Sequence, residues 1–152
     1  MEIHAAHAHG LLGGFLSPLY NKRTDAYGGD INGRLKLTLE VIAEVRKICG
    51  KDFIIDVRIS GDEYSDGGLN LNDAIYVSKQ LEKAGVDMLH VSGGTTIKRG
   101  SSIPAPGTKM GSHSALSAEI KNMFRSRWQL WDASQNHGWQ KNFWKMIRQI
   151  SA

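Results

Sequence analysis

Three histidines lie close together near the start of the chain, and imidazole is the side chain best suited to acid–base chemistry near neutral pH. His4, His7 and His9 fall within six residues of one another, where Glu2-Ile3-His4 is typical of the end of a strand. The chain has neither an HExxH pattern nor a cysteine pair, so we expect no metal. These side chains are then either solvated loop residues, or His4 and His7 donate N–H bonds to one substrate oxygen. Such a pair would polarise a carbonyl while hydride adds to the conjugated C=C bond.

A second candidate is Arg58, which interrupts the apolar run Phe53–Ile59. A guanidinium without a partner is costly in such a strand, so a carboxylate or a bound anion must compensate it. Asp56 points to the same side of the strand by the period of two, which allows an internal ion pair. Alternatively, Arg58 faces the open end of the sheet and stabilises negative charge on a cofactor ring.

Two adjacent glycines, Gly93 and Gly94, follow a further predicted strand at residues 86–92. Glycine after a strand lets a ligand approach the backbone closely. The chain contains neither GxGxxG nor GxxxxGK[ST], so the sequence favours neither a Rossmann nor a P-loop nucleotide site.

Helices and strands alternate along the chain with short connections, which predicts the α/β class with a parallel sheet. Right-handed crossovers then bring the loops that follow each strand to one common edge, where the histidines, Arg58 and the glycine pair would meet. The apolar spacing predicts, in order, a helix over residues 34–48, a strand over 53–59, a helix over 73–84 with Asn72 as its N-cap, a strand over 86–92, a long loop over 95–112 and a helix over 114–123.

Length and composition describe an ordinary globular chain. It has 152 residues, 41% of them hydrophobic and 22% charged, which is fewer than the roughly 250 residues of a closed (β/α)₈ barrel. No apolar run approaches the roughly 20 residues needed to cross a bilayer, and the start has no secretory pattern. The lone Cys49 cannot form an internal disulfide. We therefore expect a cytoplasmic protein without a membrane partner.

The net charge of +4 comes entirely from the end of the chain. Residues 1–123 hold 14 basic and 14 acidic side chains, whereas residues 124–152 hold five basic side chains against Asp132 alone. All four tryptophans also lie in this tail. This distribution argues against a nucleic-acid surface and the tail has no clean amphipathic stripe, so we expect no nucleic-acid partner.

The motifs as a set resemble the old yellow enzyme and NADH:flavin oxidoreductase family. The resemblance covers residues 1–122 and begins with the run EIHAAHAHGLLGGFLSPLYNKRTDAYGGDINGR. It continues through DVRISGDEY, the helix start GGLNLNDA and the strand AGVDMLHVSGG, in the order and spacing of that family.

This resemblance implies a (β/α)₈ TIM barrel that holds FMN, takes electrons from NADH or NADPH and passes hydride to an activated alkene, a small enone or enoyl compound. Residues 1–123 would form the central part of the barrel, strands four to six with their helices. By the matching positions, His4 and His7 would be catalytic and bind the substrate oxygen. Arg58, together with Gly93 and Gly94, would bind the flavin.

Two departures from the family pattern affect the activity expected of this chain. Many members have a proton-donating tyrosine shortly after the second histidine, whereas this chain reads His7-Ala8-His9-Gly10, with one residue inserted. Either His9 or solvent would then donate the proton, or the chemistry differs. Barrel strands one to three are also expected to be missing, so we expect the fragment to be inactive. The alternative is a non-catalytic half-barrel that self-associates through open sheet edges or binds a partner.

The tail fits the family in a different reading frame. From Phe124, joining the third base of each codon to the first two of the next permits PVPVATVGRITEPWMAEEFLENDKADI, which contains the expected strand and Gly-Arg turn. Some positions are forced, because every tryptophan codon ends in G; Trp128-Gln129 must then give alanine. We expect residues 124–152 to be an out-of-frame tail rather than a native domain, which the nucleotide sequence of this region would test.

Overall fold

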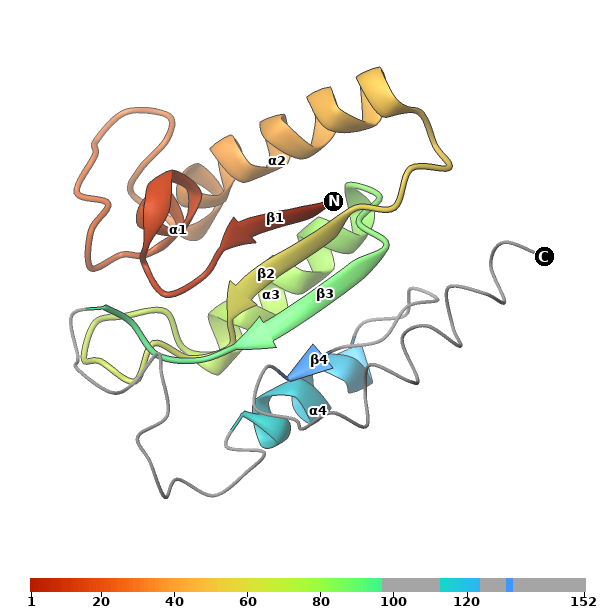
Figure 1. The fold of residues 1–152 in the computed structure, drawn as a ribbon. Coiled ribbons are helices and arrows are strands. Elements are labelled where there is room, and N and C mark those ends of the chain that lie inside the picture. Colours follow the sequence, from red (N-terminus) through yellow and green to blue (C-terminus); the bar gives the residue numbers. More distant parts are fainter. Residues whose placement is uncertain (97–112, 124–130, 133–152) are drawn as a thin grey trace.

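A single parallel sheet organises the chain. The structure is a computed structural model that describes residues 1–96, 113–123 and 131–132. The strands β1 (Glu2–Ala5), β2 (Asp56–Ser60), β3 (Met88–Ser92) and β4 (Trp131–Asp132) lie side by side in chain order, all parallel (Figure 1). The register pairs His4 with Arg58 and Arg58 with His90. The predicted α/β class with a parallel sheet is confirmed.

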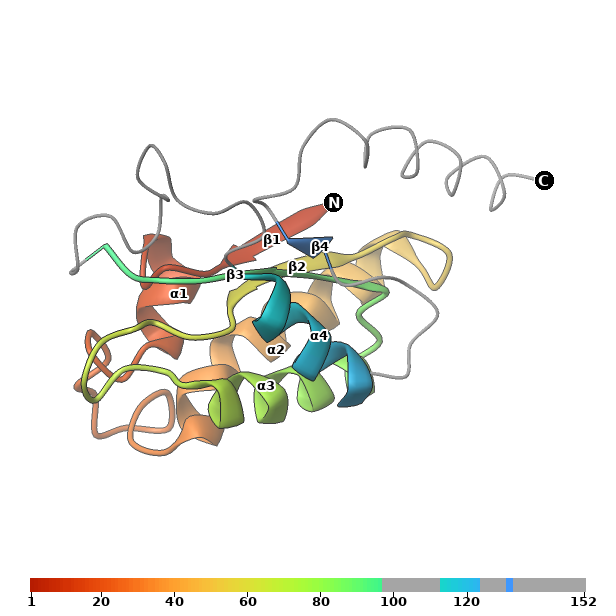
Figure 2. The same ribbon diagram turned by 90° about the horizontal axis from the view of Figure 1, so that it is seen from below.

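Helices cover one face of this sheet. The chain forms α1 (Gly10–Leu16), α2 (Ile31–Cys49), α3 (Leu71–Lys83) and α4 (Ser114–Met123). Figure 2 shows α2, α3 and α4 together on the same side of the strands, as right-handed crossovers require. The short α1 follows β1 directly and packs against both β1 and α2. No helix in the described ranges combines the length and the apolar character needed to span a membrane.

The two faces of the sheet differ in chemistry because side chains alternate along each strand. On the helical side, apolar residues of neighbouring strands join one core: Ile3, Ala5, Val57, Ile59, Leu89 and Val91. The intervening positions of β1 and β2 carry Glu2, His4, Asp56 and Arg58. The face of the sheet opposite the described helices is therefore polar, and it is the face on which the candidate site lies.

The helix ends differ from the predicted ones where a polar cap decides them. The Asp30 carboxylate accepts the N–H groups of Asn32 and Gly33, so α2 begins at Ile31, three residues before the predicted start. At α3 the predicted cap was wrong by two residues: Asn70 forms a capping box with Asp73, and Asn72 lies inside the helix. The range predicted for α4 agrees with the structure.

The strands begin later than their apolar runs. The Asp87 carboxylate accepts the backbone N–H of Ile55 and pairs with Arg46 at 2.8 Å. This polar junction occupies the residues immediately before β2 and β3, so regular pairing starts only at Asp56 and Met88. Of the predicted 95–112 loop, residues 97–112 lie outside the described residues.

The loop between α1 and α2 is held by hydrogen bonds to its own backbone. The Asn21 amide donates to the carbonyls of Phe15 and Tyr27, at 2.6 and 2.7 Å. A Cβ on Gly28 would lie 2.1 Å from the carbonyl oxygen of Arg23, so only glycine fits there. The Tyr27-Gly28-Gly29 element is therefore a structural turn.

The predicted domain boundary after Met123 stays a prediction. In the tail the structure describes only β4, which pairs with β3 through Val91 and Asp132 and through His90 and Trp131. Residues 124–130 and 133–152 lie outside the described residues.

We predict that Ile42→Ala lowers the free energy of unfolding by about 2–5 kcal/mol, because the Ile42 side chain is 0% exposed in the core. The matched control is Ile48→Ala in the same helix, since Ile48 is 79% exposed and its replacement should change stability by less than about 0.5 kcal/mol. Urea denaturation followed by circular dichroism measures both. Equal losses in the two variants would contradict the assigned faces of α2.

Candidate functional site

The turn after β1 places His7 against the ends of the next two strands. His7 and Ala8 both have left-handed backbone angles, with φ of 62° and 51°, a conformation that non-glycine residues adopt only when neighbours hold it. The His7 N–H donates to the Ser60 hydroxyl at 2.8 Å, which itself donates to the Gly94 carbonyl at 3.1 Å. The Thr96 N–H donates to the His7 carbonyl at 3.1 Å. The turn is thus fixed by residues at the ends of β2 and β3.

The three sequence-predicted histidines are brought together. The His4 ring centroid lies 5.9 Å from that of His7 and 6.4 Å from that of His9. His7 is buried, whereas His4 and His9 are exposed. His9 precedes α1 as its N-cap, but its side chain makes no capping hydrogen bond. The His9 imidazole therefore lies at the site without serving as a helix cap.

Arg58 joins this cluster through one serine. Its Nη2 donates to the Ser92 hydroxyl at 3.1 Å, and the same hydroxyl oxygen lies 3.1 Å from Nε2 of His7. Within the described residues no ion pair links Arg58 to Asp56, although both lie on the same side of β2. The guanidinium is directed toward the histidines rather than compensated by its neighbouring carboxylate.

The imidazoles of His4 and His7 are both neutral at pH 7. Burial, followed by the nearby Arg58 charge, lowers the pKa of His7 to about 4, and the carbonyls of Gly94 and Gly93 oppose this only partly. The pKa of His4 is lowered mainly by burial and then by Arg58. A neutral imidazole carries one N–H donor, so this pair is suited to donating hydrogen bonds to a substrate oxygen rather than to delivering a proton.

Two polar atoms at the site are buried without a hydrogen-bond partner among the described residues, namely His7 Nδ1 and Arg58 Nε. Arg58 Nε is always a donor, and buried donors in folded proteins almost always have an acceptor. Ring nitrogens and carbonyl oxygens of a flavin, or the carbonyl oxygen of a substrate, would supply such acceptors. The residues present therefore fit a flavin with its substrate.

Packing and backbone conformation explain why glycine occupies positions 93 and 94. A Cβ on Gly93 would lie 2.6 Å from ring atoms of His113 and 3.0 Å from Tyr64. Gly94 has a φ of 81°, which favours glycine, and its carbonyl accepts from Ser60. Packing and backbone conformation thus account for both glycines, and their contact with a cofactor stays a prediction.

Comparison with known proteins shows the family to which the chain belongs. Residues 1–130 match the model of the NADH:flavin oxidoreductase / NADH oxidase family. The chain belongs to this family. The predicted family is confirmed, and with it the cofactor class, a flavin together with NADH or NADPH.

The relatives of this flavin oxidoreductase chain are considerably longer than it is. The NADH oxidase of Thermoanaerobacter brockii is 43% identical over 94 residues, 62% of this chain and 14% of the relative. The NADPH dehydrogenase of Halalkalibacterium halodurans is 43% identical over 106 residues, 70% of this chain and 29% of the relative. The chain thus spans less than a third of the length of either relative.

Solved structures support the fold. The old yellow enzyme homologue of Zymomonas mobilis superimposes with a TM-score of 0.62 at 23% identity, covering 98% of this chain and 39% of that one. Such neighbours are of the TIM-barrel type. The strands described here correspond to part of their parallel sheet.

Sequence reasoning missed the two serines that organise the site in this family member. Ser60 and Ser92 each end a strand, where serine is common and carries no signal of its own. The period-two alternation that places Arg58 on the polar face also places Ser60 and Ser92 there. That alternation was the one available indication.

A second polar cluster lies on the same face, nearer the amino ends of the strands. The Glu2 carboxylate lies 3.1 Å from Nδ1 of the buried His90. Burial, and then the charge of Glu2, raises the pKa of Asp56 to about 6. Potential ligand atoms of Glu2, Asp56 and His90 lie within 4.8 Å of one another, and among the described residues this is the group that could hold a metal ion. It includes none of the three sequence-predicted histidines, and the expectation of no metal stays a prediction.

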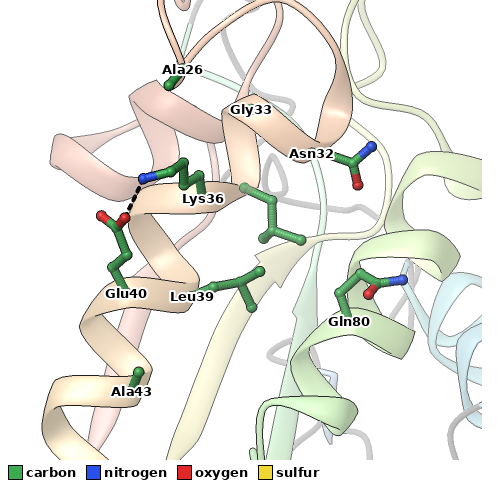
Figure 3. A pocket seen from close by; sticks show the side chains of 9 residues that line it. Ala26, Asn32, Gly33, Lys36, Leu39, Glu40, Ala43 and Gln80 are labelled. Atoms are coloured by element: carbon green, nitrogen blue, oxygen red, sulfur yellow. Dashed lines mark hydrogen bonds and ion pairs between the residues drawn. The ribbon is translucent and has the colours of Figure 1, made fainter.

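Two hollows of the surface lie away from the histidines and Arg58. A groove of about 530 Å³ runs between α2 and α3 on the helical side, lined mainly by apolar atoms and by Lys36, Glu40 and Gln80 (Figure 3). A smaller hollow of about 330 Å³ lies beside α1, lined by Leu11, Phe15 and Tyr20 among others. The α2–α3 groove lies on the opposite side of the sheet from the histidines and Arg58.

We predict that Asp56→Asn raises the free energy of unfolding at pH 7. The folded-state pKa of Asp56, about 6, lies above its ordinary value of 3.8, so the folded state binds more protons between these pH values. Stability contributed by this group is complete below about pH 4 and is lost as the pH rises through 6. The gain from Asp56→Asn should therefore disappear on acidification to pH 4.

Urea denaturation at a series of pH values measures this effect. The exposed Asp52→Asn serves as the control that removes the same charge from the surface. A stability difference between wild type and Asp56→Asn that does not change with pH would contradict the raised pKa.

Proposed function

We propose that the protein reduces the C=C bond of a small enone or enoyl compound, using FMN and electrons from NADH or NADPH. The observation that carries the proposal is the convergence of two neutral imidazoles and one guanidinium at the carboxyl ends of β1, β2 and β3. Active sites of parallel α/β folds lie at this edge of the sheet. Bound there, the flavin would supply the hydride.

The residues of the chain would bind the substrate and hold the flavin. His4 and His7 would donate N–H bonds to the carbonyl oxygen of the substrate and stabilise the negative charge that develops on it. Arg58 would hold the flavin by its unpaired Nε and balance negative charge on the ring, with Gly93 and Gly94 beside it. Since both imidazoles are neutral, neither needs to lose a proton to act.

His9 is favoured over bulk water as the proton donor for the alkene carbon. It is exposed, its ring lies 6.4 Å from that of His4, and its side chain caps no helix. It also follows His7 at a spacing of two, the position near which many family members carry a tyrosine.

The chain would supply strands four to six of a complete barrel, with β1, β2 and β3 as those strands. Because it spans 14% and 29% of the two relatives, other flavin contacts would come from barrel segments outside residues 1–123. The alternative remains a half-barrel without catalysis, acting by pairing with itself or with a partner. The outer edge of β1, which pairs with no other described strand, favours that alternative.

The catalytic assignment can be tested in a chimera. In the NADPH dehydrogenase of Halalkalibacterium halodurans, residues 1–96 of this chain would replace the matching segment. We predict a flavin-containing protein in which His7→Leu lowers enone turnover about 10²–10³-fold, the usual effect of removing one such donor. His7→Asn keeps an N–H donor and should retain most of the activity.

Turnover of 2-cyclohexenone, followed by NADPH oxidation, measures these variants. The flavin absorbance of each purified protein shows that the cofactor site is intact. A flavin-loaded His7→Leu chimera that is as fast as its parent would refute the assignment.

In the same chimera, we predict that His9→Phe slows alkene reduction by the reduced enzyme about 100-fold or more, which is the contribution of a general acid. Enone binding and flavin reduction by NADPH should not change, because His9 donates to neither. Stopped-flow absorbance separates these steps. An unchanged rate of alkene reduction would identify water as the donor.

We predict that the 152-residue chain alone purifies with far less than one FMN per chain. Its absorbance spectrum measures the flavin, and light scattering measures its size. A nearly stoichiometric flavin band would contradict this expectation. A discrete folded dimer without flavin would instead support the half-barrel alternative.

A further inference from the structure

Two buried serines hold His7 by different atoms. Ser60 accepts the backbone N–H of His7 at 2.8 Å, whereas Ser92 contacts the ring at Nε2, 3.1 Å away. Their exposed fractions are 4% and 2%, so water does not replace either contact. Ser60 therefore positions the turn, and Ser92 is the residue that acts on the imidazole.

The direction of the hydrogen bonds around Ser92 follows from Arg58. A guanidinium has donors and no acceptor, so Arg58 Nη2 must donate to the Ser92 oxygen across their 3.1 Å contact. A hydroxyl that accepts from a cation becomes a stronger donor itself. We therefore expect the Ser92 hydroxyl to donate its single proton in a hydrogen bond to His7 Nε2.

If Nε2 accepts this proton in a hydrogen bond, the ring of neutral His7 must carry its own proton on Nδ1. Nδ1 is buried and has no hydrogen-bond partner among the described residues. The opposite tautomer would donate from Nε2 to Ser92 and leave only a lone pair at Nδ1. That tautomer could not donate to a substrate oxygen from Nδ1.

We propose that Ser92 is a positioning residue that, polarised by Arg58, holds His7 as the Nδ1–H tautomer, so that Nδ1 is the atom of His7 that binds the substrate oxygen. The role of Nδ1 toward a substrate rests on the proposed function. The tautomer is a property of the chain and can be measured without flavin or substrate.

Nitrogen-15 NMR of the full chain, labelled at histidine, tests the proposal, because protonated and unprotonated ring nitrogens have widely separated shifts. His7→Gln identifies the His7 signals. At pH 7, wild type should show a protonated Nδ1 and an unprotonated Nε2. Ser92→Ala should shift the population toward the Nε2–H form or mix the two forms, and Ser92→Thr, which keeps the hydroxyl, should restore the wild-type pattern.

Ser60→Ala is the matched control, since it removes a buried hydroxyl that contacts the backbone of His7 but not its ring. In this variant the His7 tautomer should stay that of wild type. A wild-type spectrum with Nε2–H or with averaged shifts overturns the proposal, even if Ser92→Ala does not fold. An unchanged tautomer in a folded Ser92→Ala overturns it as well. A chimera that shows the Nδ1–H tautomer but does not reduce enones would refute the proposed function and leave this inference intact.

Discussion

The site depends on one hydroxyl group, that of Ser92, which connects side chains from three neighbouring parts of the sheet. Ser92 ends β3, accepts from Arg58 of β2 and contacts the ring of His7, which follows β1. The parallel register makes this possible, because it places residues 4, 58 and 90 at one level and the strand ends just beyond them. Without that register, the Arg58 guanidinium and the His7 imidazole would have no common partner.

The resulting polar face lowers the stability of the fold, because it buries polar atoms that have no hydrogen-bond partner among the described residues. Such atoms indicate where a ligand binds. Burial lowers the pKa of both His4 and His7, and the positive charge of Arg58 acts in the same direction. Arg58 Nε, which is always a donor, and His7 Nδ1 have no hydrogen-bond partner among the described residues. A folded protein retains such atoms where a ligand supplies what the chain lacks. The apolar core on the other face, with Leu35, Ile42 and Leu81 fully buried, provides the stability that this arrangement requires.

Much of this could be predicted from the sequence, because the controlling features are periodic or local. The stripe of α2, the alternation of Asp56 and Arg58 and the contact between His4 and His7 all follow from spacing. The cap of α3 was misplaced because Asn70 and Asn72 are both good caps, and only the reciprocal bond with Asp73 decides between them. The partner of Arg58 could not be predicted, since Asp56 is its neighbour along the strand and Ser92 is 34 residues away. The packing of His113 against Gly93 could not be predicted either, because no pattern in the sequence links these two residues.

The central claim is that the strand-end cluster, and not another surface of the chain, meets the flavin. A titration of the flavin-free, nitrogen-15-labelled chimera with FMN, followed by NMR, tests this most directly. The account predicts shift changes concentrated at His4, His7, Arg58 and Gly94, with none along the α2–α3 groove at Ala26 and Ala43. Changes confined to that groove, or a cluster that does not respond at saturation, would contradict it.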